Sequence, residues 1–188
     1  MEPQKQNDGV RYKLANAMKE CMRTAPVEKI TVKEIVETCG LTRQTFYRNF
    51  QDKYDLINWY FDKILLESFE HMGEGRTVYE SLVNKFEYIQ MEQLFFRAAF
   101  KNDQQNCLRD HDFELIQEFY TKQIESRTGR KISTELQFEL EMYCLGSVYM
   151  TVQWVLGYRK CTPEDLAHAM TESMPVRLQD VFQELGLI

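Results

Sequence analysis

The sequence has few of the residues, and none of the motifs, on which most enzyme active sites depend. Histidine occurs only three times, and the five cysteines are widely spaced with no CxxC pair. There is no glycine-rich loop of the kind that cradles phosphate, no nucleophile motif and no histidine–carboxylate pair on one helix. These absences argue against an enzyme, and we expect neither a metal ion nor a cofactor.

The cysteines also bear on redox chemistry. They stand at positions 21, 39, 107, 144 and 161, mostly within apolar helical patterns, and their number is odd. This pattern favours buried, reduced thiols. The alternative is a metal- or redox-responsive protein, with Cys107, His111 and His71 as the candidate ligands.

Neither a leader peptide nor a membrane span is expected. The first nine residues are polar, unlike the apolar segment of a secretory signal. The uncharged stretch from Met142 to Leu156 contains Ser147, Thr151 and Gln153, and it is too short and too polar to cross a bilayer. We therefore expect a soluble, cytoplasmic protein with no membrane association.

Charge is distributed unevenly along the chain, although the net charge is −6. Residues 1–50 carry nine Lys/Arg and six Asp/Glu, a net +3, whereas residues 51–188 carry fourteen and twenty-three, a net −9. A locally basic segment on an acidic body fits a small nucleic-acid-reading domain attached to a larger domain that does not bind nucleic acid. Charge alone does not decide between this interpretation and an ordinary acidic protein.

Apolar residues recur three and four positions apart along most of the chain, and no alternating pattern typical of strands is present. We predict an all-α fold of about nine to ten helices. The predicted helices span residues 9–23, 31–40, 43–49, 52–72, 77–89, 90–100, 113–127, 134–156, 163–174 and 176–185. Residues 101–112 are polar and are expected to form a loop and a short turn, and the segment Gly73 to Gly75 is expected to end the helix before it.

The stretch from Ile30 to Asp55 carries the most specific local signals. Thr31 and Glu34 have the spacing of a capping box, which predicts the start of a helix. Gly40 can adopt the left-handed conformation that ends helices, and Thr42 can cap the next one. Two short helices joined by a tight turn form a helix-turn-helix, whose second helix enters the major groove of DNA.

In the second of these helices, Phe46 and Phe50 are four positions apart and are expected to face the core. The remaining side chains are then left for the other faces; they are Arg43, Gln44, Thr45, Tyr47 and Arg48. A module that binds only proteins would not need this polar and aromatic face. The pattern therefore predicts a DNA-binding domain over residues 1–51 and a helical regulatory and dimerisation domain over residues 52–188.

The segment from Thr31 to Leu56 resembles the N-terminal domain of the TetR (tetracycline-repressor-like) family of transcription regulators. The shared pattern is a capped helix, Gly40-Leu41-Thr42 at the turn, the aromatic pair Phe46-Tyr47, and then the F-x-x-K-x-x-L motif from Phe50 to Leu56. The chain has Asn49 where the family often has histidine. The resemblance implies a homodimer that binds a palindromic DNA operator.

Position along the helix suggests a role for each candidate DNA-binding residue. Arg43 and Gln44, at the start of the second helix, are best placed for base edges, since Arg pairs with guanine and Gln with adenine. Thr45 lies beside them and can contact a base or a phosphate. The family uses a tyrosine matching Tyr47 on a phosphate, and Arg48 is either a second phosphate contact or a solvated charge.

Three further candidates lie at helix starts. Lys53 opens the long helix, where its charge and the helix dipole both favour a phosphate. Thr31 has the same position on the preceding helix, although a role as a plain cap is equally compatible with the sequence. Thr42 belongs to the same candidate set, because it stands at the start of the recognition helix.

The helix expected over residues 134–156 is apolar nearly all round. It carries Met142, Tyr143, Leu145, Val148, Tyr149, Val152, Trp154 and Val155, so each of its faces must be covered. Either other helices of the same chain enclose it or a second subunit supplies one wall. We favour the second subunit, because the resemblance implies dimerisation through the last long helices, here about residues 134–185.

Aromatic residues are concentrated between positions 59 and 100. They predict either a pocket for a small apolar or aromatic effector or an ordinary core. The candidate pocket residues from the whole chain are Phe61, Phe86, Phe95, Tyr120, Tyr143, Ser147 and Thr151. On the pocket hypothesis, an effector tilts the helix that starts near Asp52 and changes operator affinity.

The segment F-F-R-A-A-F-K-N-D-Q-Q-N-C-L-R-D, residues 95–110, carries a shorter resemblance together with the break at Pro175. It is similar to the C-terminal domain of a TetR subset that includes an activator of dihydroxyacetone kinase operons, which works with a protein co-activator. This resemblance implies that the signal comes from a protein instead of a small molecule. The sequence leaves both sources of signal open, and it does not distinguish repression from activation.

Overall fold

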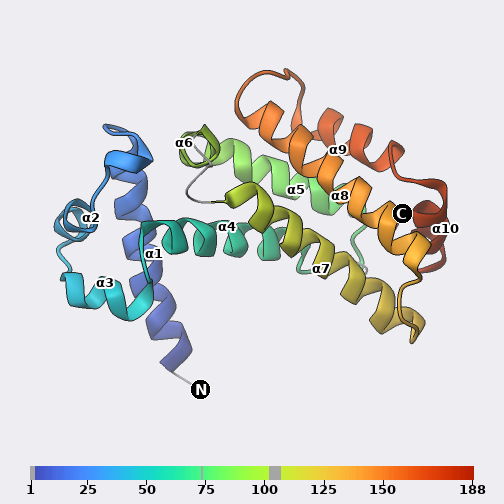
Figure 1. The fold of residues 1–188 in the computed structure, drawn as a ribbon, viewed down its shortest axis with the longest axis horizontal. Helices are drawn as coiled ribbons and strands as arrows, with labels where there is room; N and C mark the ends of the chain where they lie inside the picture. The colour runs from blue at the N-terminus through green and yellow to red at the C-terminus, as the bar shows by residue number, and fades with distance from the viewer. Residues whose placement is uncertain (1–2, 73, 102–106) are drawn as a thin grey trace. The chain divides into compact units, whose positions relative to one another are not determined.

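The structure is a computed structural model that describes residues 3–72, 74–101 and 107–188, with side chains from Asp8 onward. In these ranges it is all-α, with ten α-helices, one 3-10 turn and no strand beyond an isolated bridge between Met72 and Arg76 (Figure 1). The elements are α1 (Pro3–Met22), η1 (Val27–Lys29), α2 (Val32–Cys39), α3 (Arg43–Asn49), α4 (Lys53–Phe69), α5 (Val78–Met91), α6 (Gln93–Lys101), α7 (Leu108–Thr128), α8 (Thr134–Val155), α9 (Pro163–Glu172) and α10 (Val176–Glu184). The predicted fold class is confirmed.

The described residues fall into two compact units. The first comprises the chain up to Lys63 together with Glu92–Leu108, and the second comprises Ile64–Met91 and Arg109–Ile188. Helix α4 therefore contributes residues to both units, and α6 belongs to the first. The predicted boundary between residues 51 and 52 separates a DNA-binding from a regulatory domain. It is a division by function, which these two units do not test, and it stays a prediction.

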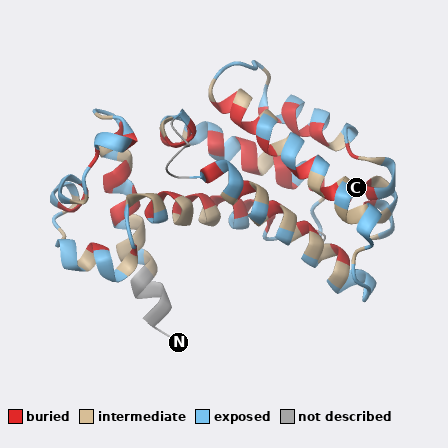
Figure 2. Ribbon diagram, viewed as in Figure 1, coloured by how far each residue is buried: buried red, intermediate tan, exposed pale blue. Residues whose placement is uncertain are grey.

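The core of the first unit is built by the buried faces of α1 to α4 and α6. Helix α1 packs against α2, α3 and α6, and its Leu14 and Met18 are fully buried. Figure 2 shows the corresponding alternation of buried and exposed residues along each helix. Removing a side chain of this size from water stabilises the fold by about 1.5–3 kcal/mol, so these faces, and not helix propensity, hold the short helices in place.

The second unit is organised around α8. Helix α5 packs on α9 and α8 packs on α10, and the ring of Phe86 on α5 meets that of Trp154 on α8 with 5.6 Å between centroids. A buried ion pair lies in this core, with Lys85 Nζ 3.3 Å from Asp112 Oδ1. The two side chains are 5% and 0% exposed.

The two largest boundary differences concern α1 and α7, while α4 ends at Phe69 instead of residue 72 and α6 begins at Gln93 instead of residue 90; one prediction lies partly outside the described residues. Helix α1 begins at Pro3 instead of residue 9, and α7 begins at Leu108 instead of Phe113. The predicted loop over 101–112 is therefore wrong at its end, because Leu108 and Asp112 are fully buried by packing that a polar sequence does not reveal. Residues 102–106 and Gly73 lie outside the described residues.

Candidate nucleic-acid interface

The turn between α2 and α3 has the geometry that the sequence predicted. Thr31 and Glu34 form a reciprocal capping box at the start of α2. Gly40 ends this helix in the left-handed conformation, with φ 64° and ψ 31°, where a Cβ would be strained. The Leu41 N–H then donates to the carbonyl of Val36 at 2.9 Å, which closes the turn and directs the chain into α3.

Helix α3 has one buried face and one exposed face. Phe46 is fully buried on it, and Phe50, which follows its last turn, is 2% exposed. Arg43, Gln44 and Arg48 are exposed, and Tyr47 is 59% exposed with its ring at the edge of Phe46. The amphipathic division expected of a recognition helix is therefore present over its seven residues.

The threonine hydroxyls at this site are engaged in helix capping. Thr42 Oγ1 accepts from the Thr45 N–H at 3.1 Å and lies 2.9 Å from Thr45 Oγ1. Thr31 Oγ1 donates to Glu34 Oε2 at 2.7 Å, and this hydroxyl and the Thr31 N–H together lower the pKa of Glu34. The hydroxyls of Thr31 and Thr42 therefore serve the helix starts first.

Lys53 has a different environment from the one that the sequence suggested. Its Nζ donates to the carbonyl oxygens of Val27, Glu28 and Ile30 at 2.7, 2.9 and 2.8 Å. An ammonium group has three N–H bonds, so none is left for a phosphate in this arrangement. Burial lowers the pKa of Lys53, and the residue ties the start of α4 to the segment that leads into α2.

Arg11 is a residue of this site that sequence reasoning missed. Its Nη2 donates to the carbonyl oxygen of Asn49, the last residue of α3, at 3.0 Å. The guanidinium carbon lies 5.1 Å from the ring centroid of Phe50 and 5.4 Å from that of Trp59. Because Arg11 and Asn49 are 38 positions apart, no local pattern connects them.

The predicted effector pocket is only partly assembled. Phe86, Tyr120, Tyr143, Ser147 and Thr151 line one cavity of the second unit. Phe61 and Phe95 belong to the first unit instead, where Phe61 packs on Phe96 and Phe100, and Phe95 packs on Tyr60. These two residues therefore do not line this cavity, because α6 packs within the first unit, and their role in a pocket stays a prediction.

The cavity itself is small. Its volume of about 10 Å³ is close to that of a single water-sized sphere. Its wall includes Lys85, whose ion pair with Asp112 is described above, and burial raises the pKa of both Tyr120 and Tyr143. The structure therefore contains a polar core at this point, without preformed room for a drug-sized effector.

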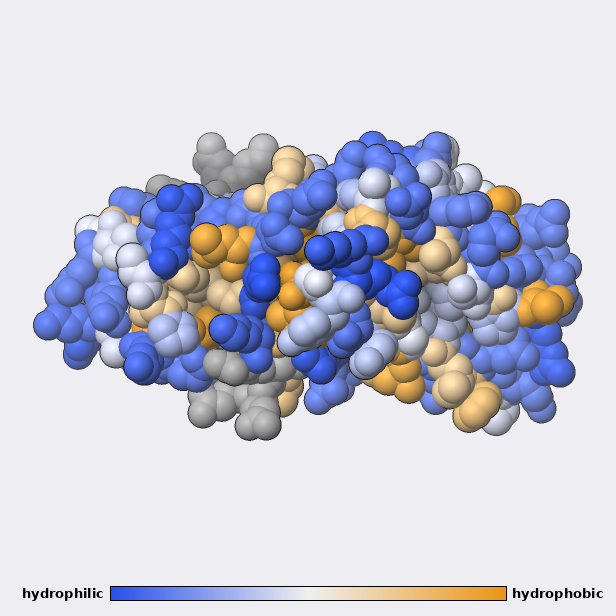
Figure 3. Space-filling view, turned by 90° about the horizontal axis from the view of Figure 1, so that it is seen from above, coloured by the Kyte–Doolittle hydropathy of each residue, from blue (hydrophilic) through white to orange (hydrophobic). Residues whose placement is uncertain are grey.

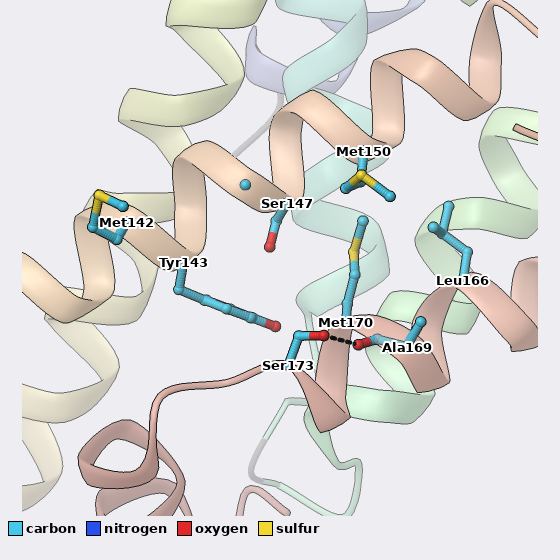
Figure 4. A pocket seen from close by; sticks show the side chains of 9 residues that line it. Met142, Tyr143, Ser147, Met150, Leu166, Ala169, Met170 and Ser173 are labelled. Atoms are coloured by element: carbon cyan, nitrogen blue, oxygen red, sulfur yellow. Dashed lines mark hydrogen bonds between the residues drawn. The ribbon is translucent and has the colours of Figure 1, made fainter. Parts of the chain in front are cut away.

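A larger cleft of about 210 Å³ lies between α8 and α9. Figure 4 shows Tyr143 and Ser147 of α8 on one side and Met170 and Ser173 on the other. The Ser173 hydroxyl donates to the carbonyl oxygen of Ala169 at 2.7 Å. The rest of the lining is largely methionine and leucine, from Met142, Met150 and Leu166, so the cleft is apolar with a few hydroxyls.

Helix α8 also carries an uncovered apolar stripe. We call it the α8 stripe; its members are Phe138, Met142, Leu145 and Tyr149, which are 64%, 57%, 52% and 59% exposed. Their spacing of three and four residues places them on one face of the helix. Hydrophobic side chains also reach the surface among hydrophilic ones in the space-filling view of Figure 3.

Other kinds of site find little support in the described part of the chain. No group of three or more His, Cys, Asp or Glu side chains placed to hold a metal ion occurs within the described residues. Among the same residues, no helix is long and apolar enough to cross a membrane. The candidate metal ligands Cys107, His111 and His71 are therefore not gathered into such a group.

Two short helices joined by a tight turn, with the second exposing a basic and polar face, define a helix-turn-helix DNA-binding regulator. Residues 15–59 match the family described as bacterial regulatory proteins, tetR family. Residues 76–175 match the family described as transcriptional regulator C-terminal region. The chain belongs to the TetR family of transcriptional regulators.

Individual relatives agree with this assignment. Over 90 residues the chain is 28% identical to the HTH-type dhaKLM operon transcriptional activator DhaS of Lactococcus lactis subsp. lactis (strain IL1403). That match covers 48% of this chain and 48% of the relative, so it spans about half the length of the curated protein. It supports the resemblance to the DhaS-containing subset that the sequence suggested.

Solved structures show the same fold. The dihydroxyacetone kinase operon activator DhaS superposes with a TM-score of 0.69 at 18% identity, covering 91% of this chain and 97% of that one. A TetR transcriptional regulator from Streptococcus agalactiae 2603V superposes with a TM-score of 0.61 at 18% identity, covering 95% and 96%. At these identities the likeness concerns the fold alone.

Proposed function

We propose that this protein is a homodimeric transcription regulator that binds a palindromic operator and changes its DNA affinity in response to a signal received by the second unit. The observation that carries the DNA-binding part is the exposed face of α3 opposite the buried Phe46. Half-sites about one helical turn or slightly more apart follow from a two-fold dimer. Since the target is DNA, we place its action in the cytoplasm.

The contact roles follow from position on α3. Arg43 and Gln44 stand at its N-terminal end and are proposed to read base edges, with Thr45 beside them. Tyr47 and Arg48 are proposed to bind the phosphate backbone, which supplies affinity without sequence preference. We assign capping to Thr31 and Thr42 and leave Lys53 out of the contact set, because its ammonium is used within the protein.

The α8 stripe supports dimerisation. Four large apolar side chains on one helix face, each more than half exposed, form a contiguous patch of the kind that usually marks a protein interface. A second copy would cover this stripe with its own in a two-fold arrangement. The predicted dimer surface over residues 134–185 is narrowed in this proposal to the stripe and the adjoining helix α9.

Two cavities of the second unit bear on the source of the signal. The cavity lined by the predicted pocket residues, about 10 Å³, would have to expand many-fold to hold a small molecule of ordinary size, whereas the apolar cleft between α8 and α9, about 210 Å³, offers room for a small effector. The curated relative is named a transcriptional activator, and we propose activation with a protein co-activator as a second candidate beside effector-controlled regulation. Helix α4, which has residues in both units, is the proposed route of the signal.

Fluorescence anisotropy tests the DNA-binding proposal. Wild type, Arg43→Ala and Tyr47→Phe are titrated with the DNA upstream of the protein's own gene, with a duplex selected by wild type from a random library, and with a scrambled duplex, at two salt concentrations. We expect Arg43→Ala to lose about 1–3 kcal/mol of sequence preference and Tyr47→Phe to weaken all duplexes alike. Equal, weak binding of every duplex by every variant would reject the assignment of α3.

A further inference from the structure

Arg11 makes a contact that nothing in the helix-turn-helix pattern requires. It lies on α1, and its guanidinium donates to the carbonyl oxygen of Asn49 at 3.0 Å. The same group is positioned near two aromatic rings, 5.1 Å from the centroid of Phe50 and 5.4 Å from that of Trp59. These partners belong to the end of α3, the residue after it, and α4.

The physical chemistry of this contact suits an arginine. The last carbonyls of a helix have no partner inside the helix, and the C-terminal end carries the negative end of its dipole. A guanidinium is planar, remains charged, and can donate a hydrogen bond while resting against aromatic rings. Phe50 and Trp59 are themselves in edge contact, with 5.6 Å between centroids, so the three side chains form one cluster.

Helix α3 depends on such support at its ends. It has only seven residues, and an isolated helix of this length is not stable in water. At its start, Thr42 caps it from within the helix-turn-helix itself. At its end, Arg11 supplies a charged side chain from outside α3, which donates to the Asn49 carbonyl next to the buried Phe50.

We propose that Arg11 is a positioning residue for DNA recognition: by holding the Asn49 carbonyl and the Phe50–Trp59 pair, it fixes the direction in which Arg43 and Gln44 face the bases. The inference rests on the proposed function of α3. Arg11 acts through the helix and touches no base. A small tilt at the C-terminal end of α3 moves its base-reading end, where hydrogen bonds to base edges are directional and tolerate little displacement.

The test compares Arg11→Met and Arg11→Lys with wild type and with the control Arg23→Met, whose arginine is 64% exposed and pairs with Glu20 one turn away. Circular dichroism first fixes a temperature at which each variant is folded. Anisotropy then gives affinity for the duplex selected by wild type and for a scrambled duplex over a range of salt concentrations. Arg43→Ala serves as the reference for a lost base contact.

We expect Arg11→Met to lose about tenfold in preference for the selected duplex, comparable to one base contact, with the salt dependence of binding unchanged. Arg11→Lys should recover part of that preference, and Arg23→Met should match wild type. A preference equal to that of wild type in Arg11→Met would overturn the proposal. So would an equal loss on both duplexes with a salt slope reduced by about one, since Arg11 would then be a phosphate contact. Wild type without any preference would instead reject the proposed function itself.

Discussion

Lys19 Nζ on α1 donates to Glu92 Oε1 at 2.8 Å, directly before α6 begins. The Tyr60 hydroxyl joins the pair, accepting from Lys19 and donating to Glu92, both at 3.1 Å. This triangle connects α1, α4 and the start of α6 within the first unit. Residue Glu92 is also the point at which the chain enters that unit after α5, so the triangle fixes the start of α6.

The Lys19–Glu92 pair should contribute to stability in a pH-dependent way. Burial lowers the pKa of Lys19, but the hydrogen bonds to Glu92 and Tyr60 outweigh it, and the net pKa is raised above 10.5. Because the pKa of Lys19 is higher in the folded than in the unfolded state, its charge stabilises the fold fully at pH values below the unfolded-state pKa. This contribution is lost as the pH rises through the folded-state pKa. We expect Lys19→Met to cost about 1 kcal/mol in free energy of unfolding at pH 7, with the difference from wild type shrinking above pH 10.5.

Urea unfolding at pH 7 and at increasing pH measures this difference. The control is Lys33→Met, because Lys33 is 60% exposed and lies 3.8 Å from its partner Glu37. A surface pair of this kind contributes little. If Lys19→Met and Lys33→Met lowered stability equally, the triangle would have no special role.

Lys53 should behave as a structural residue. Lys53→Met removes the donor to three carbonyls, and we expect the free energy of unfolding to fall by about 1–3 kcal/mol. The salt dependence of DNA binding should stay as in wild type, because no phosphate contact is lost. A salt slope reduced by about one, with stability unchanged, would instead support the phosphate role that the sequence suggested.

The α8 stripe should control dimerisation. Leu145→Glu places a charge among Phe138, Met142 and Tyr149, and we expect a monomer in sedimentation equilibrium, because an unpaired charge is costly inside an apolar interface. Its fold by circular dichroism should be retained, since Leu145 is 52% exposed in the single chain. Val176→Glu, at a site on α10 that is 72% exposed, should leave assembly unchanged. Equal assembly of both variants would place the interface elsewhere.

Two glycines offer a matched test of the turn. Gly40 has φ 64°, whereas Gly9 lies inside α1, and a Cβ would meet nothing within 4 Å at either position. Gly40→Ala is therefore expected to destabilise by about 1 kcal/mol through backbone strain alone. Gly9→Ala should stabilise by up to about 1 kcal/mol, because alanine favours the helix. Thermal unfolding measures both, and a stabilising Gly40→Ala would contradict the left-handed cap.

The helix-turn-helix could be predicted because its signals are local. Thr31 with Glu34, then Gly40 and Thr42, act within a few residues of one another, and each has one structural meaning. The contacts of Arg11 and Lys53 join segments 38 and 23–26 positions apart, and no periodicity encodes them. The same lack of long-range information explains why the pocket prediction grouped Phe61 and Phe95 of the first unit with residues of the second unit.

An aromatic pattern shows that Phe61 and Phe95 are buried, but not in which core they lie. The ion pair of Lys85 with Asp112, 27 positions apart, was hidden for the same reason. From the sequence alone, a buried charge pair cannot be distinguished from two surface charges, because burial depends on elements brought together only by the tertiary fold.

The cysteines should differ sharply in reactivity. Cys144 is fully buried, and burial, followed by the nearby Asp112 charge, raises its pKa to about 12. At pH 8 its thiolate is therefore scarce and shielded, whereas Cys107 is exposed, and thiolate is the reactive form. We expect a thiol reagent at pH 8 to modify Cys107 well before Cys144, as located by mass spectrometry of the peptides. Cys107→Ser should remove the fast phase and leave Cys144 unmodified until urea unfolds the protein. The prediction of buried thiols is right for Cys144 but wrong for exposed Cys107, and Cys21, Cys39 and Cys161 are partly exposed. Rapid modification of Cys144 in the folded protein would instead point to opening of the α8 core and would favour the redox-responsive alternative.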